Sequence, residues 1–81
     1  MKTSRKFKGI SFSITGKFNN NSRKNIKNMI VNEDGIISNK ISKNLDYLIV
    51  GEHPGSKLVL AKMENITIIT EDEFLKLAEK I

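Results

Sequence analysis

Apolar and polar residues follow two different periods along this chain of 81 residues. Ile10, Phe12 and Ile14 alternate with serines, a period of two that predicts a strand with one apolar face and one face of small polar groups. The segment DYLIV is an almost continuous apolar run, which is typical of a buried strand in a parallel sheet. Together with two shorter apolar runs, the pattern predicts strands over residues 7–15, 36–38, 46–50 and 66–69.

Three segments between and after these strands have the spacing of amphipathic helices. Apolar residues recur at positions 26, 29 and 30 in the first segment and at 74, 77, 78 and 81 in the last. Thr70 and Glu73 have the spacing of a capping box, and Asp34 with Gly35 is expected to end the first helix. The predicted helices follow the N-cap candidates Ser22, Ser56 and Thr70 and cover residues 23–31, 57–63 and 71–81.

The order of these elements, β-α-β-β-α-β-α, predicts an α/β layered fold with a mostly parallel sheet. Ligands of such sheets bind at the carboxyl ends of the strands, against helix N-termini. This rule selects two places in the sequence. One is Thr15-Gly16 after the first strand, and the other is Gly55-Ser56-Lys57 before the second helix.

The charge of the chain is unevenly distributed. Its 14 Lys and Arg residues exceed its 9 Asp and Glu residues, giving a formal net charge of +5. Residues 1–32 contain eight of these bases and no acid, whereas residues 33–81 contain six bases and nine acids. A basic third of the chain beside a mildly acidic remainder indicates an anionic partner, with nucleic acid first among the candidates.

Composition excludes several classes of site. The chain has no cysteine, so it has no disulfide, no thiolate zinc site and no cysteine nucleophile. No apolar run approaches the 18 or so residues of a membrane span, and we expect a cytoplasmic protein without a membrane or small-molecule partner. The only histidine, His53, has no neighbouring nucleophile and is interpreted as an exposed loop residue. We predict no catalytic residue, no metal site and no cofactor.

Each candidate for anion binding also has a structural interpretation. Thr15 and Gly16 could simply form a turn, and Ser56 with Lys57 could be an N-cap and a surface lysine, because GEHPGSK lacks the spacing of the phosphate loop GxxxxGK[ST]. Taken singly, these two motifs favour the structural interpretation. Arg23 and Lys24 could form a solvated basic face. They are nevertheless a modest functional signal, since cations at the start of a helix oppose its dipole and an anionic ligand would relieve that cost.

Taken in order, these residues resemble a family. The Thr-Gly after the first strand, the block SKNLDYLIVG from Ser42 to Gly51 and the sequence Pro54–Lys57 are similar to those of BRCT domains. The resemblance extends over residues 7–81. It is strongest to the subgroup found in bacterial NAD-dependent DNA ligases and in the large subunit of replication factor C. Two positions differ from the family pattern: Asp34 replaces the first residue of a frequent Gly-Gly pair, and Phe74 replaces a widespread tryptophan.

The resemblance implies a fold and a site. The fold would be a three-layer BRCT domain over residues 7–81, with a four-stranded parallel sheet in the order 2-1-3-4 flanked by three helices, after a flexible basic segment of residues 1–6. The first and third helices would lie on one face and the second on the other. The family's phosphate pocket corresponds here to the residues Thr15, Gly16, Arg23 and Lys57.

Two functions remain open at this point. The first is a non-catalytic module of a bacterial ligase, replication or repair protein that binds a 5′-phosphorylated end or nick of duplex DNA. Lys17, Lys24 and Lys27 would support that binding, and the protein would be associated with the nucleoid. The second is a protein-interaction domain that docks to its parent enzyme or to another replication or repair protein, including as a phosphoprotein-binding domain. Direct enzymatic activity has no support among the residues.

Overall fold

A parallel sheet of four strands forms the centre of the molecule. The computed structural model describes residues 6–19 and 22–80, except for the side chain of Lys80. The strands are β1 (Ser11–Thr15), β2 (Ile36–Ile37), β3 (Tyr47–Val50) and β4 (Thr67–Thr70). Their order is β2-β1-β3-β4 and every neighbouring pair is parallel, which confirms the predicted topology. All four strands therefore end at one edge of the sheet, which we call the carboxyl edge.

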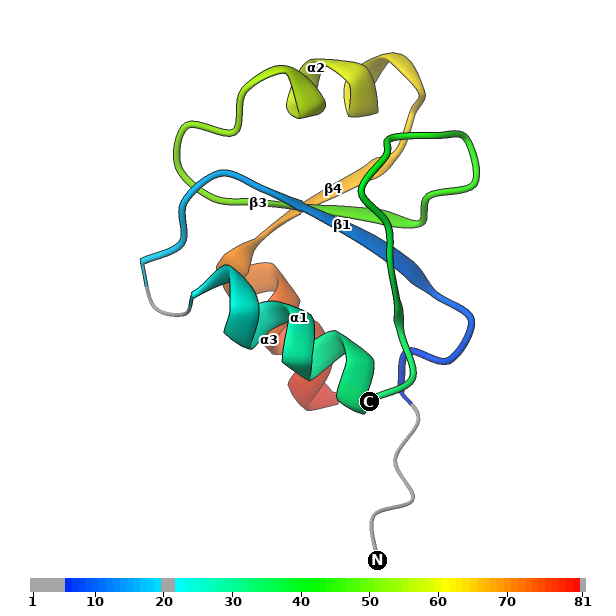
Figure 1. Cartoon of the computed structure of the whole chain (residues 1–81), viewed down its shortest axis with the longest axis vertical. Coiled ribbons are helices and arrows are strands. Elements are labelled where there is room, and N and C mark those ends of the chain that lie inside the picture. The colour runs from blue at the N-terminus through cyan, green and yellow to red at the C-terminus, as the bar shows by residue number, and fades with distance from the viewer. Residues whose placement is uncertain (1–5, 20–21, 81) are drawn as a thin grey trace, which may run out of the picture.

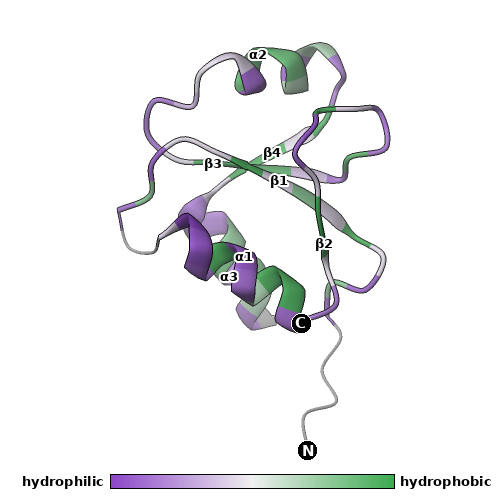
Figure 2. Cartoon of the chain, in the orientation of Figure 1, coloured by the Kyte–Doolittle hydropathy of each residue, from purple (hydrophilic) through white to green (hydrophobic). Residues whose placement is uncertain are grey.

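Three helices complete the layers and confirm the predicted order of elements. α1 (Arg23–Asn32) and α3 (Glu71–Lys80) lie on one face of the sheet, and α2 (Ser56–Met63) lies on the other (Figure 1). α1 follows β1 and α3 follows β4 directly, so both helices begin at the carboxyl edge. The strands are largely apolar, whereas the loops that connect them are mostly polar (Figure 2).

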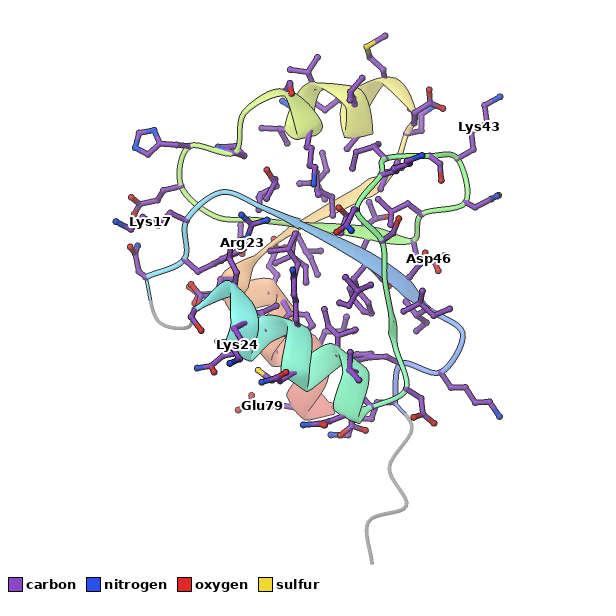
Figure 3. All side chains as sticks on the ribbon, in the orientation of Figure 1. Lys17, Arg23, Lys24, Lys43, Asp46 and Glu79 are labelled. Carbon is purple, nitrogen blue, oxygen red and sulfur yellow. The ribbon has the colours of Figure 1, made fainter. Side chains whose placement is uncertain are left out.

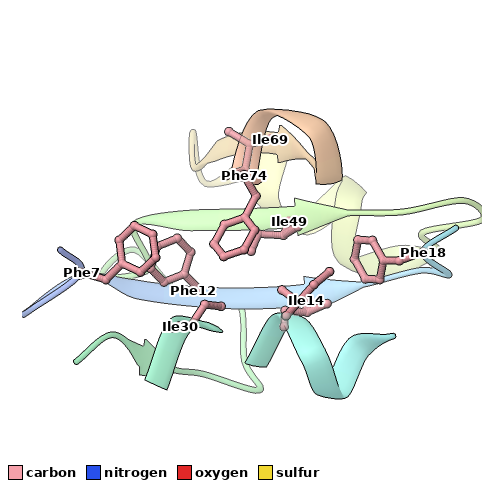
Figure 4. Close-up of a cluster of buried hydrophobic side chains, with 9 residues drawn as sticks. Phe7, Phe12, Ile14, Phe18, Ile30, Ile49, Ile69 and Phe74 are labelled. Carbon is pink, nitrogen blue, oxygen red and sulfur yellow. The ribbon is translucent and has the colours of Figure 1, made fainter. Parts of the chain in front are cut away.

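The larger apolar core lies between the sheet and the helices α1 and α3 (Figure 4). Its centre is aromatic: the ring centroids of Phe7 and Phe12 are 5.0 Å apart, and those of Phe12 and Phe74 are 5.9 Å apart, both in edge-to-face arrangements that favour aromatic pairs. The buried members of this core are Phe7, Phe12, Ile14, Phe18, Ile26, Ile30, Ile49, Ile69 and Phe74. Phe74 is thus a core residue, as expected for the position where the family often has tryptophan.

A smaller core lies on the opposite face, beneath α2. It contains Leu45, Leu48, Ala61 and Ile66. On this face β1 contributes hydroxyl side chains instead of apolar ones, because Ser11, Ser13 and Thr15 alternate with the apolar residues that face α1 and α3. Ser13 is completely buried, and its hydroxyl has no hydrogen-bond partner among the described residues.

The first strand is shorter than predicted. Residues 7–9 form a turn instead of the beginning of β1, with the Ile10 N–H donating to the Phe7 carbonyl at 2.9 Å and Gly9 at a φ of +79°. The Phe7 N–H donates to the Glu33 carbonyl at the end of α1. Lys6 is also attached, because its Nζ donates to the Ala78 carbonyl of α3 at 2.7 Å. The other residues of the predicted flexible segment 1–6 lie outside the described residues.

The helix ends confirm the predicted caps Ser22 and Thr70 and the end of α1 at Asp34 with Gly35, and they correct one cap. Ser22 Oγ accepts from the Asn25 N–H, and Thr70 exchanges both hydrogen bonds of a capping box with Glu73. Ser56, however, is the first residue of α2, and the N-cap is Gly55, with no side-chain hydrogen bond. At the end of α1, Asp34 and not Gly35 has the positive φ, of 66°.

Gly35 is required for close packing at the end of α1. Its N–H donates to the Ile30 carbonyl and the Asp34 N–H donates to the Val31 carbonyl, which is the Schellman arrangement at a helix C-terminus. A Cβ at position 35 would collide with the Ile30 side chain. The glycine therefore permits close packing of the turn against α1, while Asp34 adopts the left-handed conformation. The other element bounds differ from the prediction by at most one residue, except at the end of α3, where Ile81 lies outside the described residues.

The buried hydroxyl of Ser13 gives a test of this packing. Ser13→Ala should raise the free energy of unfolding by about 1 kcal/mol, because it removes a buried polar group without a partner and changes the volume little. Ser11→Ala is the matched control on the same strand face, where the hydroxyl accepts from the Asp46 N–H at 3.0 Å, and it should lower the free energy. Urea denaturation measures both; a loss of stability in Ser13→Ala would contradict the packing described for α2.

Candidate functional site at the carboxyl edge

The loops that follow β1 and β3 are bound to one another. The N–H groups of Lys17 and Glu52 donate to each other's carbonyl groups at 2.8 and 2.7 Å, and the Gly51 N–H donates to the Thr15 carbonyl at 2.9 Å. Glycine is required on both sides of this contact. A Cβ on Gly16, whose φ is +88°, would lie 2.8 Å from the Glu52 carbonyl oxygen, and one on Gly51 would overlap the backbone of Lys17.

Thr15 connects this loop pair to the approach to α2. Its hydroxyl donates to the Pro54 carbonyl at 2.6 Å, and the residue is 8% exposed. Lys57 follows Pro54 by three residues, in the first turn of α2, and is half-buried. A hydroxyl has only one proton to donate, so Thr15 can donate to a ligand only by leaving the Pro54 carbonyl.

The backbone N–H of Gly16 points away from β3. A trans peptide directs its carbonyl and its N–H to opposite sides, and the Thr15 carbonyl of this peptide accepts from Gly51 on the β3 side. The Gly16 N–H therefore faces the side of β1 on which β2 lies. β2 pairs with β1 at Ser11 and Phe12, so no strand of the described residues lies beside this part of the edge.

Arg23 occupies the same open side of β1. Its Nη2 atom donates to the Ile14 carbonyl at 3.3 Å, and the side chain extends from the start of α1 toward the end of β1 (Figure 3). α1 has no acid in its first turn, so the positive end of the helix dipole is combined here with a guanidinium group. Arg23 and the Gly16 N–H thus face the same side of β1.

The remaining predicted residues lie at different distances from this point. Lys17 and Lys24 are exposed on the same side of the molecule as Arg23 (Figure 3). Lys27 is half-buried, one helical turn after Arg23 and Lys24. Lys57 lies in the other layer, in the first turn of α2. No hydrogen bond among the described residues joins it to Thr15, Gly16 or Arg23.

The other half of the carboxyl edge is acidic, a feature that the sequence interpretation did not anticipate. A hollow of about 270 Å³ lies at the ends of β3 and β4, and its charged lining consists of Glu52, Glu71 and Asp72 with one base, Lys17. Glu52 accepts a hydrogen bond from Asn19 Nδ2 at 2.7 Å. The signal was present in the order of elements: Glu52 follows β3 by two residues and Glu71 opens α3 after β4, so the predicted parallel topology already placed both at this edge.

Comparison with known proteins identifies the fold. The family model of the BRCA1 C Terminus (BRCT) domain matches residues 2–78. This chain belongs to the BRCT family. That finding confirms the resemblance carried by the Thr-Gly pair, the block that ends at Gly51 and the Pro-Gly-Ser-Lys sequence.

Curated relatives of this BRCT domain are bacterial DNA ligases. The chain is 46% identical over 76 residues to the DNA ligase of Thermosipho africanus, which covers 94% of the chain and 11% of that ligase. It is 41% identical over 78 residues to the ligase of Fervidobacterium nodosum, covering 96% and 12%, and 40% identical over 73 residues to that of Thermotoga maritima, covering 90% and 11%. The chain thus spans about a tenth of the relatives' length.

Within the described residues, no helix is both long and apolar enough to cross a membrane.

The contact between the two loops makes a prediction for stability. Gly16→Ala should lower the free energy of unfolding by about 2 kcal/mol or more, because a positive φ costs a non-glycine residue about 1 kcal/mol or more and the clash with Glu52 adds to it. Gly9→Ala is the matched control, because Gly9 has a φ of +79° but open space around its Cβ position. This variant should lose only the part of the unfolding free energy that comes from the positive φ. Equal losses in urea denaturation of the two variants would show that the close approach of the loops is not a constraint.

Proposed function

We propose that this BRCT domain binds a 5′-phosphorylated end or nick of duplex DNA through Thr15, Gly16, Arg23 and Lys57, as a non-catalytic module of a DNA ligase or of another replication or repair protein. The observation that supports the proposal most is the convergence of the Gly16 N–H and the Arg23 guanidinium on the open side of β1. The three relatives reported above are named DNA ligases, which gives the proposal its context in DNA metabolism.

The chemistry of the site suits a terminal phosphate. Such a phosphate is a dianion at neutral pH, with several oxygen acceptors. The backbone N–H of Gly16 and the positive end of α1 supply fixed dipoles, Arg23 can bind two oxygens at once, and the ammonium group of Lys57 adds a charge from the other layer. Contacts to phosphate position a protein on DNA without selecting a sequence, so we propose no sequence preference.

Thr15 would take part by changing its hydrogen-bond partner. In the structure its proton is donated to the Pro54 carbonyl. A phosphate oxygen is a charged acceptor and forms a stronger hydrogen bond than a carbonyl does. The proposal therefore implies that binding moves the Thr15 hydroxyl from Pro54 to the ligand. The segment that leads from Pro54 to Lys57 would then lose this hydrogen bond.

The phosphate pocket predicts a loss of discrimination in Lys57→Ala. The unsubstituted domain should bind a hairpin duplex with a 5′-phosphate about tenfold or more tightly than the same hairpin with a 5′-hydroxyl, as expected for charge-assisted hydrogen bonds of about 1.5–3 kcal/mol. Lys57→Ala should remove most of this ratio. Lys62→Ala, an exposed lysine on the same helix, is the matched control and should keep it. Fluorescence anisotropy measures the affinity of each of the three proteins for both hairpins, and equal binding of the two hairpins by the unsubstituted domain would disprove the pocket.

A second candidate function is docking to a protein partner. It is favoured by three exposed apolar residues of α2, Val59, Leu60 and Met63, which are 58%, 46% and 71% exposed. Docking by this surface would not use the phosphate pocket. Binding to the parent enzyme or to a replication partner that is unchanged in Lys57→Ala, together with unchanged DNA binding, would support docking over the DNA proposal.

A further inference from the structure

The two helices that begin at the carboxyl edge on the same face of the sheet carry opposite charges there. α1 opens with Arg23 and Lys24, and none of its ten residues is acidic. α3 opens with three consecutive acids, Glu71–Glu73. The hollow beside α3 is lined by three acids, Glu52, Glu71 and Asp72, and by one base, Lys17, so acids outnumber bases there. A polyanion held at the end of β1 therefore meets an attractive surface on the α1 side and a repulsive one on the α3 side.

The outer surface of α1 continues this attractive region beyond the pocket. Lys24 and Lys27 are separated by three positions and lie on one stripe. Asn25, Asn28 and Asn32 follow at i, i+3 and i+7, and all three are exposed. Their side-chain amides are hydrogen-bond donors that suit phosphate and sugar oxygens.

The end of this surface is also marked by charge. Glu33 is the C-cap of α1 and Asp34 follows it, so two acids follow the lysines and asparagines of this helix. The ten residues of α1 span about 15 Å. That length corresponds to about four base pairs of B-form DNA, at about 3.4 Å per phosphate along each strand.

We propose that the duplex runs from the phosphate pocket along the outer surface of α1, from Arg23 to Asn32, and that the acidic hollow at Glu52 and Asp72 keeps it away from α3. This inference rests on the proposed function for its starting point, and it adds the direction of the DNA and the length of the contact. Lys17 lines the acidic hollow and is therefore not counted, so four cations contact phosphates: Arg23, Lys24, Lys27 and Lys57. The logarithm of the affinity should fall with the logarithm of salt concentration with a slope of about 3.6, at about 0.9 per contact.

Two variants with equal changes in net charge test the direction. Lys24→Gln with Lys27→Gln removes two cations from α1, and Lys62→Gln with Lys76→Gln removes two exposed cations from α2 and α3. The first pair should weaken binding of a 5′-phosphorylated hairpin about tenfold or more and reduce the salt slope by about two. The second pair should leave the slope unchanged. Because Lys27 is half-buried, Lys24→Gln alone is measured as well and should reduce the slope by about one.

The outcomes separate this inference from the pocket. Equal weakening by both pairs, or a larger loss of slope in the Lys62 and Lys76 pair, would overturn the direction along α1, whether or not the 5′-phosphate matters. If the unsubstituted domain binds phosphorylated and hydroxyl hairpins equally, the proposed pocket fails, and an unequal effect of the two pairs still supports contact along α1.

Neutralising the hollow with Glu52→Gln and Asp72→Asn should increase affinity several-fold, and a decrease would contradict its repulsive role.

Discussion

The approach of the loop after β1 to the loop after β3 is the constraint on which the carboxyl edge depends. Gly16 and Gly51 let two backbones come so close that Lys17 and Glu52 exchange both of their hydrogen bonds. This contact fixes the peptide between Thr15 and Gly16, and so it fixes the direction of the Gly16 N–H. It also holds the segment that leads to α2, through the Thr15 hydroxyl. The proposed phosphate pocket, with contributions from both layers, depends on this one contact.

Much of this arrangement could be predicted from the sequence, because it follows from periodicity and topology. The alternation around Phe12, the run before Gly51 and the amphipathic last helix predict the layers, and the carboxyl-edge rule then selects Thr15, Gly16 and Lys57. Conformations set by tertiary packing could not be predicted. Phe7 leaves the expected strand because a turn at Gly9 carries it into the core beneath α1 and α3. Tertiary packing also decides the end of α1, where Gly35 permits close packing and Asp34 adopts the left-handed conformation.

The uneven charge of the chain has a more specific meaning in the folded molecule. The eight bases before residue 33 indicate an anionic partner but give no direction of approach. In the fold, the basic start of α1 lies on the same face as the acidic start of α3, so the carboxyl edge is divided into an attractive and a repulsive half. Net charge alone, which is +5, does not reveal this division, because it depends on which helices lie beside each other.

The proton and nitrogen chemical shifts of the Gly16 amide test the central claim most directly, because this group would donate to the phosphate. In a titration of the ¹⁵N-labelled domain, a 5′-phosphorylated hairpin duplex should shift the Gly16 amide proton downfield at saturation, as hydrogen bonding to a charged acceptor does. The same hairpin with a 5′-hydroxyl should leave it nearly unchanged, while the amides of α1 respond to both. A Gly16 amide that is indifferent to the phosphate, with shifts confined to other parts of the domain, would contradict the account.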